Sequence, residues 1–160
     1  MIYRIRVVLD FKEDVIRDLE IDQNASFEDL HFTILKNFGL ENKELASFFI
    51  SDENWTQGEE IFLQNYDENL NQMIMKNISL KSLSTRSMNY LYVYDYLKLW
   101  TFFIEIVEES KKILGENYPK KIYEYGSVPN EPPKKTFNSN LKNDDSEFNL
   151  DDEDDFLDFY

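Results

Sequence analysis

The chain has 160 residues, a formal net charge of −15 and no cysteine. Its length fits one domain, and the lack of cysteine excludes disulfides, thiolate metal sites and cysteine nucleophiles. Nucleic acids and anionic membranes are bound by lysine and arginine, so 17 basic residues against 32 acidic ones argue against both as direct partners. We expect a cytoplasmic protein, because we find neither a signal peptide nor an apolar run long enough to span a bilayer.

Alternating apolar residues predict a β-hairpin at the start of the chain. Residues 2–11 alternate with a period of two, and residues 15–21 repeat the pattern after a short polar turn at 12–14. The strand face that we expect to be buried carries Ile5, Val7 and Leu9.

Helix signals follow at both ends of the next segment. Ser26 and Asp29 have the spacing of a capping box, and Gly39 fits a left-handed residue after a helix C-terminus. Apolar residues recur at helical spacing between them. We therefore predict a helix over 27–38 that packs across the hairpin.

The middle of the chain is predicted to be mostly strand. A run of alternating tyrosines over 90–96 and an apolar run over 100–107 predict a second hairpin. Its tyrosines could form a stacking platform for bases, but we favour a core role because no basic groove accompanies them. Shorter elements are expected before this hairpin: strands over 45–50 and 61–63, a loop or short helix over 69–75, and a helical turn over 78–83.

Beyond Glu108 the chain changes character twice. Four prolines and Gly126 predict an irregular arm that packs Ile122, Tyr123 and Val128 on the sheet. Residues 144–160 then hold nine acids and no base, which predicts a self-repelling, disordered tail. We therefore divide the chain into an α+β domain over 1–135 and an acidic tail over 136–160.

The search for catalytic chemistry yields little. The single histidine, His31, lies in the predicted helix, and we favour a partly buried side chain held by a local hydrogen bond. Four scattered glycines form no phosphate-binding loop, and no metal-ligand spacing occurs, so we expect neither cofactor nor metal. A spatial pair of catalytic carboxylates stays open, because its spacing cannot be read from sequence.

The end of the tail is an unusual place for aromatic side chains. A short acidic and aromatic segment of this kind can dock into a basic, apolar groove of a partner protein. The alternative is a tail that only keeps the protein soluble. The predicted partner-binding residues are Phe156, Leu157, Asp158, Phe159 and Tyr160.

Four segments of the chain together form a recognisable set. They are Phe27-Glu28-Asp29-Leu30-His31, Asn37-Phe38-Gly39-Leu40, Leu45-Ala46-Ser47-Phe48 and Tyr92-Val93-Tyr94-Asp95-Tyr96, continuing through Trp100 to Ile104-Glu105. With them the chain resembles the Plasmid pRiA4b ORF-3-like family, roughly over Ile2 to Pro133. This resemblance implies a compact α+β roll, with a mixed or antiparallel sheet packed on one main helix, and a link to mobile elements as a passenger or TnpR-type protein. It implies no reaction.

The departures from the family pattern concern one polar cluster. Leu97 and Lys98 replace a glycine and an aspartate, Phe102 replaces a histidine, and the cysteine and glycine pair expected near Tyr118 is missing. The family matches that remain are Asp95, Trp100 and His31. These three are the candidate residues of an enzymatic or ligand site.

Three functions are compatible with these observations. The first is a non-enzymatic interaction module that binds a protein with a basic surface. The second is an enzyme of unrecognised class with a polar site near Asp95 and Trp100. The third is an accessory protein that associates with nucleic acid through a basic partner. We lean away from an enzyme.

Overall fold

The computed structural model describes residues 1–134. The predicted tail over 136–160 and its end at Phe156–Tyr160 lie outside the described residues. The elements in chain order are β1 (Ile2–Leu9), β2 (Ile16–Asp22), α1 (Phe27–Phe38), β3 (Ala46–Ile50), β4 (Glu60–Phe62), β5 (Met73–Ile74), the 3₁₀ turn η1 (Met75–Asn77), α2 (Leu80–Ser84), β6 (Asn89–Tyr94), β7 (Trp100–Ser110) and β8 (Lys120–Tyr125).

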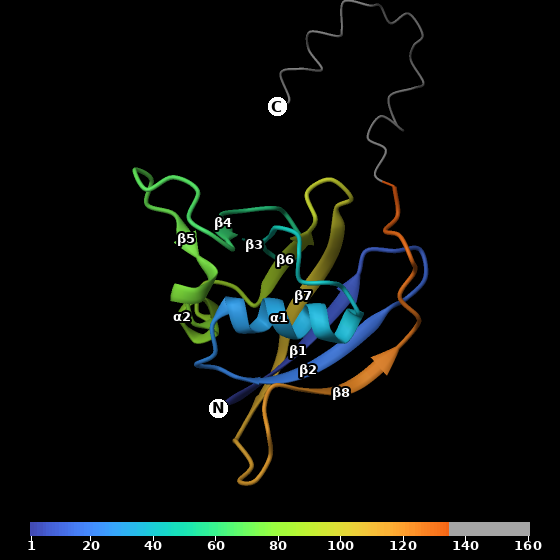
Figure 1. The fold of residues 1–160 in the computed structure, drawn as a ribbon. Helices are drawn as coiled ribbons and strands as arrows, with labels where there is room; N and C mark the ends of the chain where they lie inside the picture. Colours follow the sequence, from blue (N-terminus) through green and yellow to red (C-terminus); the bar gives the residue numbers. More distant parts are fainter. Residues whose placement is uncertain (135–160) are drawn as a thin grey trace, which may run out of the picture.

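One sheet forms the body of the domain, and α1 lies across one of its faces (Figure 1). The strand order is β5-β4-β3-β6-β7-β1-β2-β8. All neighbouring strands are antiparallel except β4 and β5, which are parallel. The α+β class, with the sheet packed on one main helix, is therefore confirmed.

Helix α1 has the bounds that its end signals predict. The Ser26 side chain accepts a hydrogen bond from the Asp29 amide at 3.1 Å, and the Asp29 carboxylate accepts one from the Ser26 amide at 2.9 Å. Gly39 adopts φ 68°, as a left-handed C-cap residue does. Arg17 on β2 stabilises this end of the helix, because its Nε donates to the Asn37 carbonyl at 3.2 Å.

The core between α1 and the sheet is built largely from aromatic rings. Phe27 on the helix packs edge-on against Phe48 and Tyr90, each with ring centroids 5.2 Å apart. The predicted core role holds for Tyr90, Tyr92 and Tyr94, which are buried. Tyr96 lies beyond the strand and is exposed.

The predicted irregular arm beyond Glu108 needs correction. Strand β7 continues to Ser110, and residues 120–125 form the edge strand β8 against β2. A β-bulge breaks the β2–β8 register between Asp18 and Leu19, so β8 lacks the clean alternation by which a strand is found in sequence. Ile122 and Tyr123 are exposed, and of the three residues predicted to pack only Val128 lies against the core.

The stretch over 69–75 differs from the expected loop or short helix. It ends in the two-residue strand β5, which continues directly into the turn η1. Within residues 1–134, no helix is both long and apolar enough to cross a membrane.

Candidate functional site

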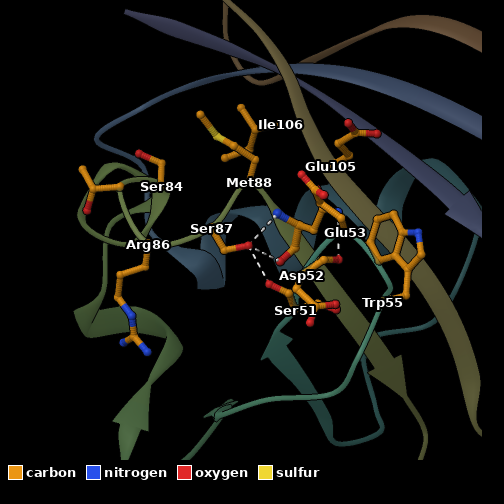
Figure 2. Close-up of a pocket in the computed structure, with 12 residues that line it drawn as sticks. Ser51, Asp52, Glu53, Trp55, Ser84, Arg86, Ser87, Met88, Glu105 and Ile106 are labelled. Carbon is orange, nitrogen blue, oxygen red and sulfur yellow. Dashed lines mark hydrogen bonds between the residues drawn. The ribbon is translucent and has the colours of Figure 1, made fainter.

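A hollow of about 710 Å³ opens where β6 begins and is the candidate functional site. Two connections wall it, one between β3 and β4 and the other between α2 and β6, and β7 closes the remaining side with Glu105 and Ile106. Figure 2 shows Arg86 and Trp55 at opposite ends of the hollow, with the Ser87 side chain between them.

The Ser87 hydroxyl joins the two walls. Its Oγ donates to the Ser51 carbonyl at 2.7 Å and accepts from the Asn89 amide at 3.0 Å (Figure 2). The Asn89 side chain adds a second link between the walls, because its Nδ2 donates to the Asp52 carbonyl at 3.0 Å. The bonds of Ser87 to Ser51 and of Asn89 to Asp52 join segments more than 30 residues apart, whereas the bond between Asn89 and Ser87 is local.

Asp52 shapes the loop that presents Trp55. Its Oδ1 accepts from the amides of Asn54 at 2.9 Å and Thr56 at 3.0 Å. These backbone hydrogen bonds, that of Thr56 above all, lower the pKa of Asp52. Trp55 itself adopts φ 60°, a left-handed conformation that is costly for a bulky residue. The loop therefore holds the indole in a fixed place.

Apolar side chains line the floor and one end of the hollow. The Trp55 ring packs edge-on against Phe103, with centroids 5.1 Å apart, and stays half-buried. Ile106 is buried beneath the hollow, whereas Met88 is 49% exposed at its rim. An exposed methionine at the rim of the hollow is a surface that adapts well to an apolar ligand.

The charges around the hollow are mainly negative. Glu53 and Glu105 are exposed, and within residues 1–134 their carboxylates accept no hydrogen bond. Arg86 is the basic residue of the lining, and it forms an ion pair with Glu59 at 2.5 Å. Glu105 also lies opposite Arg6 on β1, which interacts with it electrostatically and forms an ion pair with Asp18. A ligand that enters the hollow thus meets the carboxylates of Glu53 and Glu105, and Arg86 already has a partner.

The structure places the predicted residue His31 in the core, away from this hollow. Its side chain is fully buried, and its Nδ1 lies 2.7 Å from the Tyr92 hydroxyl, so the expected local hydrogen bond is replaced by a bond to a residue 61 positions away. The Nε2 has no partner within residues 1–134. Burial lowers the pKa of His31 to about 4.

Asp95 and Trp100 lie at the two ends of the β6–β7 turn. The Asp95 carboxylate accepts from the amides of Leu97 at 3.1 Å and Lys98 at 3.2 Å, as a turn-forming aspartate does. Trp100 is buried opposite Tyr94. No hydrogen bond joins either residue to His31 in the described part of the chain. The structure gives each of the three a role in folding.

The lining of the hollow was missed by sequence reasoning. Its residues are serines, acids and asparagine from two loops, and such residues are common in any loop. One signal was present: a tryptophan directly after four polar residues in a connecting segment. Among residues 1–134, no group of three or more histidine, aspartate or glutamate side chains could hold a metal ion.

Comparisons with known proteins identify a family and a related fold. The family model described as Plasmid pRiA4b ORF-3-like protein matches residues 1–136. A crystal structure of a protein of unknown function from Methanosarcina mazei Go1 is similar, with a TM-score of 0.68 and 18% sequence identity. The match covers 77% of this chain and 68% of that one. None of the curated proteins compared with the chain matches it.

Proposed function

This chain belongs to the Plasmid pRiA4b ORF-3-like family, and we propose that it works as a non-enzymatic interaction module. Its hollow binds a short segment of a partner protein in which lysine or arginine flanks apolar side chains. One observation carries the proposal: the hollow combines the exposed apolar surface of Trp55 and Met88 with the unbonded carboxylates of Glu53 and Glu105.

Two physical effects support binding of such a segment. When apolar side chains of the partner cover Met88 and Trp55, apolar surface is removed from water. This burial contributes about 25 cal/mol for each Å². Lysine or arginine beside Glu53 and Glu105 gains Coulomb energy, and a cation over the Trp55 ring gains a further cation–π interaction. Because the loops are already ordered by Ser87 and Asp52, binding costs little loop entropy.

A calorimetric titration tests this proposal. The full chain is titrated with a short synthetic peptide in which a pair of lysines precedes a pair of leucines. We expect saturable binding that weakens at least about tenfold in the Glu53→Gln/Glu105→Gln variant, since close charge pairs at interfaces are worth about 1.5 kcal/mol or more.

A matched control separates the hollow from the general acidity of the chain. The Asp67→Asn/Glu68→Gln variant removes the same charge from an exposed loop that does not line the hollow. Equal loss of binding in both variants contradicts the proposal, because the attraction would then come from net charge alone. No loss in either variant also contradicts it, because Glu53 and Glu105 would then contribute nothing to binding.

The aromatic end of the tail remains a second predicted contact with a basic partner. Its residues are Phe156–Tyr160, and a chain that ends at Lys134 removes them together with the tail acids. If the tail contributes, the shortened chain binds the peptide more weakly while the effect of Glu53→Gln/Glu105→Gln persists. The links to mobile elements and to nucleic acid through a basic partner stay predictions.

A further inference from the structure

The connection between β7 and β8 exposes two large apolar side chains at its tip. Leu114 is 97% exposed and Ile113 58% exposed, and Lys111 and Lys112 directly precede them. Figure 1 shows this connection projecting beyond the end of the sheet, near the N-terminus. Exposed apolar side chains at a projecting tip mark a contact surface.

The tip has a defined shape. The Ile113 amide donates to the Tyr118 hydroxyl at 3.3 Å, and the Glu116 amide donates to the Ile113 carbonyl at 3.2 Å. Gly115 takes φ 89°, which few other residues would adopt in this turn. A tip that is ordered before binding loses little conformational entropy in a complex.

The tip and the hollow are complementary in chemistry. The tip offers two aliphatic side chains and two lysines, of which Lys112 also forms an ion pair with Asp22 of its own copy at 3.6 Å. The hollow offers the carboxylates of Glu53 and Glu105 with the apolar surface of Trp55 and Met88. The tip therefore has the features of the segment that the hollow is proposed to bind, so this inference rests on the proposed function.

The two surfaces lie at the same end of the sheet. Strand β6 begins at Asn89 opposite Glu105, and β7 runs on from there to Ser110, where the projecting connection starts. Two copies related by a twofold axis can thus each offer a tip to the hollow of the other. We propose that the chain forms a dimer in which Ile113 and Leu114 of each copy enter the hollow of its partner.

Analytical ultracentrifugation of the full chain tests the dimer. Because the net charge of −15 opposes association, the measurement is made at physiological salt, where screening acts over about 8 Å. We expect a dimer that Leu114→Asp dissociates. Leu97→Asp is the matched control, since Leu97 is a 93% exposed leucine in the β6–β7 turn, and it leaves the dimer intact.

A disulfide test locates the contact. The chain has no cysteine, so a mixture of Leu114→Cys and Met88→Cys variants is expected to give a crosslinked heterodimer on oxidation. The Leu97→Cys and Met88→Cys mixture gives none. A chain that stays monomeric, a dimer that Leu114→Asp leaves intact, or equal crosslinking in both mixtures overturns the dimer.

The peptide titration distinguishes this failure from failure of the proposed function. Leu114→Asp removes the most exposed apolar side chain of the tip and leaves every residue that lines the hollow unchanged. If the chain is monomeric but the Leu114→Asp variant still binds the lysine–leucine peptide, the dimer is wrong and the interaction module stands. If neither the tip nor the peptide is bound, both proposals are wrong.

Discussion

The Nδ1 of His31 lies 2.7 Å from the hydroxyl oxygen of Tyr92, and both side chains are fully buried between α1 and the sheet. This contact ties the helix to β6. Burial also keeps the histidine in its neutral form, because it lowers the pKa of His31 to about 4 from an ordinary value of 6.5. The consequence is a stability that depends on pH.

We predict that the free energy of unfolding falls as the pH drops from 6.5 to 4. In that window the unfolded chain binds a proton at His31 and the folded chain does not, so protonation favours unfolding. The full loss is on the order of 3 kcal/mol. Urea unfolding at several pH values measures it, and a His31→Gln variant should show a smaller decrease. Equal slopes for the two proteins would contradict the buried, neutral histidine.

The second prediction concerns Asp18, whose carboxylate is buried on the other face of the sheet. It accepts hydrogen bonds from Arg4 at 2.6 and 3.1 Å and from Arg6 at 2.8 Å twice. Burial would raise the pKa of Asp18, but the hydrogen bonds from Arg6 and Arg4 outweigh it and leave the pKa lowered. The carboxylate therefore stabilises the fold above its ordinary pKa, and this stabilisation is lost below it.

Asp18→Asn should lower the free energy of unfolding at pH 7 by about 2 kcal/mol, because it leaves two arginines without their shared anion. The loss is moderate since both arginines keep contact with water. Glu108→Gln is the control: Glu108 lies 3.7 Å from Arg4 and is exposed, so its replacement should cost less than about 1 kcal/mol. Denaturant unfolding that gives equal losses would refute the special role of Asp18.

The third prediction tests the loop that walls the hollow. A Cβ added at Gly58 would lie 2.5 Å from the carbonyl oxygen of Ile50, which is part of strand β3 and cannot move away. We expect Gly58→Ala to cost about 2 kcal/mol. Gly39→Ala meets no neighbouring atom and only has to adopt φ 68°, so it should cost about 1 kcal/mol. Thermal unfolding of the two variants checks this order, and the reverse order would contradict the loop geometry.

The part of the fold that sequence predicts well is set by local interactions. Helix α1 is fixed by Ser26, Asp29 and Gly39, all within two residues of its ends, and the first hairpin follows from strict alternation. Strand β8 was missed because it contains a bulge at Ile122, which the pairing with Asp18 and Leu19 of β2 skips. A register shift of this kind depends on a partner strand about 100 residues away, and no local pattern encodes it.

The candidate site was beyond sequence reasoning for a similar reason. The hollow exists because Ser87 meets Ser51 across 36 residues, and neither serine is unusual in its own segment. Conversely, His31, Asp95 and Trp100 became candidates because they match the pattern of the family. In the structure His31 and Trp100 are buried in the core and Asp95 bonds to its own turn. A catalytic or ligand role for the three residues stays a prediction.

The fluorescence of Trp55 tests most directly whether the hollow binds a basic, apolar segment. The chain has two tryptophans, so Trp100→Phe leaves Trp55 as the reporter at the end of the hollow. Titration with the lysine–leucine peptide should change the Trp55 emission in a saturable way, and Glu53→Gln/Glu105→Gln should suppress the change. An emission that stays constant while calorimetry detects binding would place the peptide elsewhere and contradict the assignment of the hollow.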